Sequence, residues 1–204
     1  MFAERIKFLP QLKEIDAVIA TGSDNSARYF KSYFGKYPNI IRKNRTSYAI
    51  LEEDTSLEDI QLLGEDIFNY FGLGCRNVSK IYIPKDFDID RFYKGMFDFN
   101  EIIHHNKYAN NYDYQKAIHL MNQDDILDNG FLLLKEDSRL HAPLGMMYYS
   151  RYDSLKDLRK ELEGFEDEIQ CVISKDNIPF GQSQTPSLQD YADNVDTLEF
   201  LTNL

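Results

Sequence analysis

The sequence predicts an α/β fold with an open, mostly parallel sheet. Short apolar segments rich in β-branched residues alternate with longer segments in which apolar residues recur every three or four positions. This alternation is typical of strands joined by helices. The chain has 204 residues, of which 43% are hydrophobic and 14% aromatic, so it can bury a substantial core as one large or two small domains.

The first predicted elements are a strand, a turn and a helix. The apolar segment 16–21 is followed by Gly22, and either Ser23 or Asp24 is suited to cap the next helix. The apolar positions of that helix are Ala27, Phe30 and Phe34. Backbone N–H groups at such a strand end can meet a phosphate or a nicotinamide, so Thr21, Gly22 and Ser23 are candidate cofactor-binding residues.

The remaining elements continue the alternation. Strands are predicted over 39–42 and 47–51, and Ser56 then opens a helix whose apolar face is expected to hold Ile60, Leu63, Ile67 and Phe71. Further along, the pattern predicts a strand over 80–83, helical structure from about 90 to 121, a turn at Asn129–Gly130 into a strand over 131–134, a strand over 145–149, a helix over 154–163 and a strand over 169–174.

Cys75 lies in the turn before the strand over 80–83. Gly72 and Gly74 precede it, and glycines permit positive φ angles and the close approach of another molecule. Such a turn suits a nucleophilic thiol, and the alternative is a small apolar side chain that fills the core. A free thiol has a pKa of about 8.5, so a nucleophile needs positive charge nearby. The candidates are Arg42, Lys43, Arg45 and Arg76.

Cys171 and the histidines give weaker signals. Cys171 lies in the strand-like segment 169–174, where packing is the simpler interpretation. Two cysteines are too few for a disulfide framework or a cysteine-built zinc site. His104 and His105 are adjacent, so they cannot form the i, i+4 pair that binds a metal on a helix. We therefore predict free thiols and no metal site.

The charge balance argues against nucleic acid as a partner. The chain has 23 Lys and Arg against 34 Asp and Glu, and its net charge of −11 repels phosphate backbones. The N-terminus has no apolar signal region, and the longest apolar runs, such as 131–134, are too short to cross a bilayer. We expect a cytoplasmic protein without stable membrane insertion.

Several segments, in this order, resemble the aldehyde dehydrogenase superfamily. Val18–Ser23 resembles the T-G-S strand end of its nucleotide-binding domain. Gly72–Cys75 with Ser79–Tyr82 resembles its nucleophile turn and the strand that follows, and Pro179–Gly181 resembles its P-F-G segment. The resemblance implies an aldehyde-dehydrogenase-like catalytic domain in which Cys75 is the catalytic nucleophile.

Three further segments resemble the acyl-CoA reductase (LuxC-like) branch of that superfamily, namely 42–45, 105–114 and 128–137. This resemblance implies a long-chain acyl-CoA or another acyl thioester as substrate and NADPH or NADH as cofactor. The thiolate would displace coenzyme A, and a hydride would then release an aldehyde.

Two departures from the dehydrogenase pattern bear on the reaction. The oxidising members carry a water-activating glutamate in an E-L-G-G-K segment, whereas this chain has Ile41–Arg45 there, which favours acyl reduction over aldehyde oxidation. Arg139 stands where the superfamily has a glutamate that holds the cofactor's ribose, which implies a different or weaker cofactor contact.

Within this resemblance, residues 1–37 correspond to the last strand–helix unit of a nucleotide-binding domain and residues 38–204 to the catalytic domain. Most of the cofactor domain is then missing, so the alternative function is a truncated, non-catalytic domain for assembly or for holding an acyl group. The exposed edge of the strand over 16–21 leads us to expect a homo-oligomer or a missing N-terminal half. Another alternative is a hydrolase or acyltransferase that uses a Cys–His pair.

Overall fold

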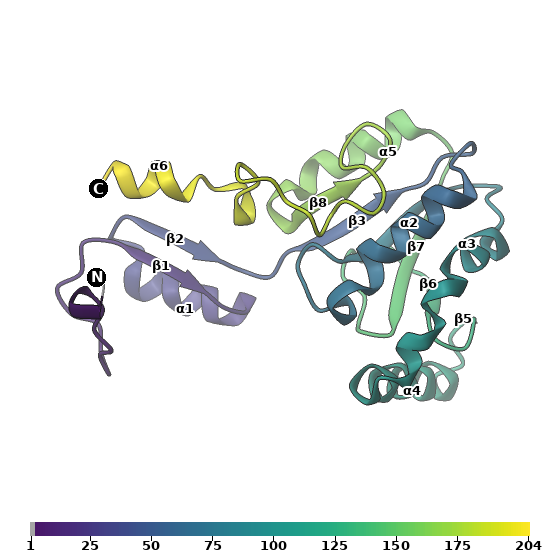
Figure 1. Cartoon of the computed structure of the whole chain (residues 1–204), viewed down its shortest axis with the longest axis horizontal. Coiled ribbons are helices and arrows are strands. Elements are labelled where there is room, and N and C mark those ends of the chain that lie inside the picture. The colour runs from purple at the N-terminus through teal and green to yellow at the C-terminus, as the bar shows by residue number, and fades with distance from the viewer. Residues whose placement is uncertain (1–2) are drawn as a thin grey trace. The chain divides into compact units, whose positions relative to one another are not determined.

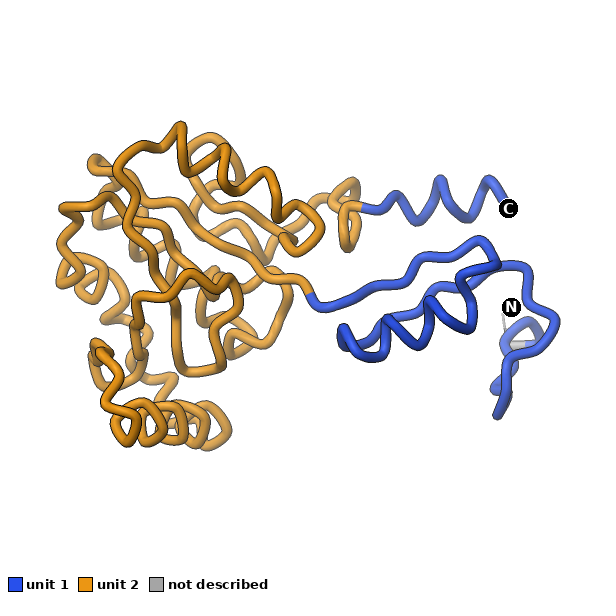
Figure 2. Tube along the Cα trace, turned by 180° about the vertical axis from the view of Figure 1, so that it is seen from behind, with its two compact units in different colours: residues 1–44, 195–204 blue, residues 45–194 orange. Residues whose placement is uncertain are grey.

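The computed structural model describes residues 3–204 and consists of two compact units (Figure 2). Unit 1 comprises the chain up to Asn44 together with Val195–Leu204, and unit 2 comprises Arg45–Asn194. Each unit has its own sheet, so each is described by itself.

Unit 1 is built on one parallel pair of strands, β1 (Val18–Thr21) and β2 (Asn39–Arg42). Helix α1 (Asp24–Phe34) connects them, and its N-cap Ser23 accepts a hydrogen bond from the Ser26 N–H at 3.3 Å. The predicted strand, turn and helix are thus confirmed. The domain boundary predicted after residue 37 lies between α1 and β2, inside this unit. The other regular segments of the unit are a 3-10 turn at Ala3–Arg5 and α6 (Thr197–Thr202).

Unit 2 contains a six-stranded sheet in the order β5-β6-β7-β4-β3-β8 (Figure 1). Every neighbouring pair is parallel except the β5–β6 hairpin, so the predicted mostly parallel sheet is confirmed. The strands are β3 (Thr46–Ile50), β4 (Val78–Pro84), β5 (Leu127–Asp128), β6 (Leu133–Glu136), β7 (Met146–Tyr152) and β8 (Ile169–Ile173). The helices are α2 (Leu57–Phe68), α3 (Ile89–Met96), α4 (Asn106–Met121) and α5 (Leu155–Leu162), with 3-10 segments at Asn69–Gly72, Phe97–His104, Glu163–Glu168 and Ala192–Asn194.

Helices cover both faces of this sheet. Side chains alternate between the faces of a strand, and Ala49 on β3, with Leu51 directly after the strand, joins the larger apolar cluster with residues of α2, α3 and α4. Tyr48 and Ile50 point the other way and join a smaller cluster that contains Leu158 and Leu162 of α5. The result is a sheet between two helical layers, as expected for parallel strands joined by helices.

Helix α2 precedes the turn that contains Cys75, and it ends earlier than the sequence predicts. Ser56 and Asp59 form a capping box at its start, and Ile60, Leu63 and Ile67 are buried as expected. Phe71 does not continue that face. It lies beyond the helix with φ of +60° and is 39% exposed, because the chain turns into the left-handed region directly after the helix.

Two other predicted elements shift. The helical stretch from 90 to 121 is confirmed but is divided into α3, a 3-10 segment and α4. The strand predicted over 131–134 begins only at Leu133, because the Asn129 side chain accepts hydrogen bonds from the N–H groups of Phe131 and Leu132 and holds them in the turn. No helix within residues 3–204 is long and apolar enough to cross a bilayer.

Candidate functional site

Cys75 lies on an exposed turn of unit 2, between the 3-10 segment Asn69–Gly72 and the first residue of β4. Gly72 has φ of +72°, a conformation that glycine adopts without strain. At Gly74 a Cβ atom would lie 3.0 Å from the Asn77 side-chain oxygen, so this position favours a residue without a side chain. The thiol is therefore presented on a tight turn in which the backbone conformation favours glycine at position 72 and the Asn77 side chain leaves little room at position 74.

The buried side chain of Asn77 stabilises this turn by hydrogen bonds. Its side-chain oxygen accepts a hydrogen bond from the Gly74 N–H at 2.8 Å, while its amide nitrogen donates to the backbone oxygens of Asp66 at 3.0 Å and Asn69 at 2.8 Å. The side chain also reaches the Ile67 oxygen at 3.3 Å. These carbonyls belong to the end of α2 and the segment after it, where no further helical N–H groups are present to donate to them. One buried side chain thus joins the helix end to the turn of Cys75.

Ser47 links the turn to the sheet. Its hydroxyl donates to the Cys75 carbonyl at 2.8 Å and accepts from the Cys171 N–H at 3.1 Å. Ser47 is fully buried on β3, directly opposite Cys171 on β8. Cys171 is buried, as its packing interpretation predicts, and burial raises the pKa of its thiol.

The P-F-G segment lies beside the same turn. The Asp66 carboxylate, fully buried on α2, accepts hydrogen bonds from the N–H groups of Gly181 at 2.7 Å and Ser183 at 2.8 Å. Arg76, the residue after Cys75, donates its Nε–H to the Ser183 carbonyl. Burial raises the pKa of Asp66, and the hydrogen bonds from Ser183 and Gly181 oppose this rise. The turn, α2 and the P-F-G segment therefore form one hydrogen-bonded assembly.

The four cations named as candidates for activating the thiol are not equivalent. Arg76 is adjacent to Cys75 in the chain, whereas Arg45 lies 3.6 Å from the Asp193 carboxylate and donates to the Ile169 carbonyl at 2.8 Å. Arg42 and Lys43 belong to unit 1. Arg76 is thus the cation that the turn itself supplies.

One histidine of unit 2, His105, contacts the 3-10 segment that leads into the turn of Cys75, and two others lie beside carboxylates. The buried His119 is 2.5 Å from the Asp124 carboxylate, and His104 is 3.8 Å from Glu101. His105 stacks on Phe71 with ring centroids 3.9 Å apart. Within residues 3–204 no hydrogen bond joins a histidine to Cys75, and no group of three or more His, Cys, Asp or Glu side chains is arranged to hold a metal ion.

Thr21, Gly22 and Ser23 lie at the end of β1 and the start of α1, in unit 1. A Cβ on Gly22 would lie 2.6 Å from the Ser26 Cβ, so the close approach of helix and strand requires a glycine there. The Ser23 hydroxyl is engaged as the N-cap of an 11-residue helix. The N–H groups of that first turn are the donors on which the prediction of a phosphate or nicotinamide contact depends.

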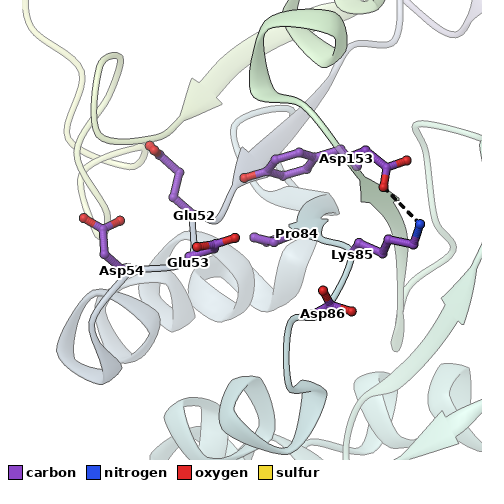
Figure 3. A pocket seen from close by; sticks show the side chains of 8 residues that line it. Glu52, Glu53, Asp54, Pro84, Lys85, Asp86 and Asp153 are labelled. Atoms are coloured by element: carbon purple, nitrogen blue, oxygen red, sulfur yellow. Dashed lines mark ion pairs between the residues drawn. The ribbon is translucent and has the colours of Figure 1, made fainter.

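A separate hollow of about 450 Å³ lies at the carboxyl ends of β3, β4 and β7 (Figure 3). Among the described residues that line it, the one cation is Lys85, 3.2 Å from Asp153, and the other acidic residues of its wall are Glu52, Glu53, Asp54 and Asp86. Of these, Asp54 pairs with Lys175. This concentration of carboxylates repels the phosphates of coenzyme A or of a dinucleotide. The hollow is also at the opposite end of β4 from Cys75, so the two belong to different places on unit 2.

The sequence does not predict the roles of three residues beside the turn of Cys75, namely Ser47, Asp66 and Asn77. Each is a polar residue in or beside an apolar segment, a pattern that signals burial with a partner but does not identify the partner. Asn77 has no typical local signal either, because an Asn side chain in a turn usually accepts from an N–H two residues later, whereas Asn77 accepts from Gly74, three residues earlier.

Solved structures of aldehyde dehydrogenases resemble this chain in fold. An NADP-dependent enzyme from E. coli matches 71% of this chain with a TM-score of 0.54 and 13% identity. An NADP-dependent glyceraldehyde-3-phosphate dehydrogenase from Bacillus halodurans, solved with NADP, matches 79% with a TM-score of 0.51 and 14% identity. Aldehyde dehydrogenase 21 from Physcomitrella patens, solved with succinate, matches 79% with a TM-score of 0.53 and 14% identity.

The matched region is only part of those proteins. It covers 37%, 40% and 44% of their respective chains. No family model matches the sequence, and no curated protein matches it significantly. Over most of its length, this chain therefore has an aldehyde-dehydrogenase-like α/β fold with a mostly parallel sheet.

Proposed function

We propose that this chain carries the acyl-accepting part of a reductase that converts a fatty acyl thioester, such as a long-chain acyl-CoA, to an aldehyde. The observation that supports this most directly is the exposed Cys75 thiol on a rigid turn of an aldehyde-dehydrogenase-like fold. The sequence around the thiol supports it further, because it resembles the nucleophile turn of that superfamily.

The proposed step at Cys75 exchanges one thioester for another. The Cys75 sulfur attacks the acyl carbonyl carbon, the bond from that carbon to the coenzyme A sulfur breaks, and coenzyme A leaves as a thiolate. The thioester bond that breaks and the one that forms have similar energies. The protein therefore has to stabilise the thiolate and to position the acyl carbonyl beside it. Arg76 supplies positive charge next to the sulfur, and the Cys75 N–H is a donor for the developing oxyanion.

The cofactor proposed is NADPH or NADH. When bound, a reduced nicotinamide supplies the hydride that turns the thioacyl group into an aldehyde and restores the thiol. Thr21, Gly22 and Ser23 are the proposed contacts in this chain, through the Thr21 hydroxyl and the N–H groups at the start of α1.

Acyl transfer to the full chain tests the proposal. The protein is incubated with radiolabelled palmitoyl-CoA, digested and mapped by mass spectrometry, alongside Cys75→Ala and the matched control Cys171→Ser. We expect label on the peptide that contains Cys75 in the wild type and in Cys171→Ser, and none in Cys75→Ala. Absence of label in the wild type, or equal label in Cys75→Ala, contradicts the proposal. Aldehyde formation after addition of NADPH or NADH then tests whether this chain performs the reduction itself.

A non-catalytic assembly domain is the second proposal, and the surface of unit 1 favours it. Several of its apolar side chains are largely exposed, including Phe8, Tyr33 and Leu198. β1 is paired on one side by β2, and a two-stranded sheet is marginal by itself. We expect self-association that rises with concentration in sedimentation experiments and weakens in Ile19→Lys, which places a charge on β1. A monomer at all concentrations contradicts this role.

A further inference from the structure

The chain has two cysteines, and the structure brings their backbones to one side chain. Cys75 is exposed and Cys171 is buried, 96 positions apart by the difference of their numbers. The Ser47 hydroxyl hydrogen-bonds to the Cys75 carbonyl at 2.8 Å and to the Cys171 N–H at 3.1 Å. The backbones of an exposed cysteine and of a buried one therefore meet at a single buried serine.

The sheet register explains this closeness. Ser47 on β3 is directly opposite Cys171 on β8, and strands in a sheet lie about 4.8 Å apart. The turn of Cys75 lies over Ser47 because it leads into β4, the neighbour of β3 on its other side. A disulfide needs Cα atoms within about 7 Å of each other. The Cys75 carbonyl oxygen and the Cys171 nitrogen each lie within 3.1 Å of the same Ser47 oxygen, so the two backbones meet at one atom.

The electrostatics of Cys171 agree with this placement. Burial raises the pKa of its thiol most, the Arg76 guanidinium lowers it, and the Cys75 sulfur raises it further. The pKa of Cys171 is therefore sensitive to the charges of Cys75 and Arg76, which agrees with the backbone contacts at Ser47.

We propose that Cys171 is the resolving partner of Cys75, so that a hydroperoxide converts the two thiols into an intramolecular disulfide. The Cys75 thiolate attacks one peroxide oxygen and becomes a sulfenic acid as the O–O bond breaks, and the other oxygen of hydrogen peroxide leaves as hydroxide, which takes up a proton to become water. The Cys171 sulfur then attacks the Cys75 sulfur, the S–O bond breaks, and water leaves with the thiol proton. The two sulfurs lose two electrons, and hydrogen peroxide is reduced to two molecules of water.

In the disulfide, the Cys75 sulfur could neither accept an acyl group nor be oxidised further. A thiol reductant would regenerate the Cys75 thiol. Without a resolving thiol, a sulfenic acid proceeds to sulfinic acid, which thiols do not reverse. The inference depends on the exposure of Cys75 and its closeness to Cys171. It holds whether or not Cys75 accepts an acyl group.

Oxidation of the native full chain tests the proposal. The protein is treated with hydrogen peroxide, remaining thiols are alkylated, and the peptides are mapped without reduction. We expect a species that has lost two hydrogen atoms and contains the Cys75 and Cys171 peptides joined, reversible by dithiothreitol. In Cys171→Ser we expect the Cys75 peptide to gain two oxygen atoms at least about tenfold faster than in the wild type.

Two results overturn the proposal. One is a wild type in which Cys75 is oxidised to sulfinic acid while Cys171 stays free, at the rate seen in Cys171→Ser. The other is a disulfide found only between two chains through Cys75. The wild-type peptide map decides the question even where Cys171→Ser fails to fold, and it needs no acyl substrate, so its outcome is separate from the acyl-transfer test.

Discussion

Lys80 is a lysine in the interior of unit 2, with no exposed surface. Its ammonium group donates to the Asp137 carbonyl and to the Ser150 hydroxyl, the latter at 2.5 Å, and lies 5.1 Å from the centre of the Tyr82 ring. These partners are neutral. Burial lowers the pKa of Lys80 to about 8, and the carboxylates of Asp137, Glu136 and Glu161 oppose this.

Lys80→Met tests the cost of that buried charge. Because the folded pKa is below the ordinary value of 10.5, the unfolded chain binds more protons between about pH 8 and pH 10.5, and the stability contribution of Lys80 rises with pH there. We expect wild type to gain up to about 3 kcal/mol of unfolding free energy relative to Lys80→Met across this range. Urea unfolding at several pH values measures it. A difference that does not change with pH contradicts the buried-charge explanation.

Asn77 is the other buried polar side chain on which a local structure depends, since it holds the turn of Cys75 to the end of α2. Asn77→Ala leaves the Gly74 N–H and three carbonyls without this partner, and we expect a loss of about 2–3 kcal/mol in unfolding free energy. Asn69→Ala is the matched control, because Asn69 contributes its backbone carbonyl, which alanine retains. Chemical denaturation compares the variants. Equal stability of both would show that Asn77 does not hold the turn.

Helix α2 and the P-F-G segment depend on each other through Asp66. The Asp66 carboxylate binds two backbone N–H groups of a segment more than a hundred residues later, and no strand or helix otherwise orders Gly181 and Ser183. A carboxylate is suited to this place because both of its oxygens accept, whereas an amide offers one acceptor only.

Asp66→Asn should therefore loosen the P-F-G segment while α2 stays helical. We expect the amides of Gly181 and Ser183 to exchange with solvent faster and the unfolding free energy to fall by about 1–3 kcal/mol, because an N–H is left facing the amide NH₂. Hydrogen exchange read by mass spectrometry checks this, with the exposed neighbour Glu65→Gln as control. If the amides of this segment were equally protected in Asp66→Asn, the carboxylate would not be what keeps the segment ordered.

The two units differ in the size of their cores. In unit 2 the larger apolar cluster joins the sheet to three helices, and a second cluster covers the other face. In the part of unit 1 that the structure describes, the buried apolar side chains are Val18 and Ile40, and α1 buries none. Stability follows buried apolar area, so unit 1 has much less to hold it together.

Native-state hydrogen exchange of the full chain should show that unit 1 is less stable than unit 2. We expect the amides of β1 and α1 to exchange at least about a hundredfold faster than those of β3, β4 and β7, since local opening costs less where little apolar surface is buried. Protection of β1 equal to that of β4 would contradict the difference and would indicate that unit 1 is held by a partner.

The sequence by itself determined the alternation of strands and helices, the helix start at Ser56, a cap at Ser23 or Asp24 that the structure assigns to Ser23, and the turn that presents Cys75. These features arise from neighbouring residues, through apolar spacing, side-chain hydrogen bonds within one turn and glycine conformation. The early end of α2 before Phe71 was not predicted, because helical spacing extends beyond the point where the chain must turn toward β4.

Only the tertiary structure decided which buried polar groups meet. Ser47 reaches Cys75 across 28 positions and Asp66 reaches Ser183 across 117, and no local pattern selects such partners. The contacts of Ser47 follow from the order of strands in the sheet, which places β3 between β4 and β8, and the contact of Asp66 depends on where the P-F-G segment packs against α2. The physical reason is that a buried donor or acceptor must be satisfied by whatever group the fold places beside it.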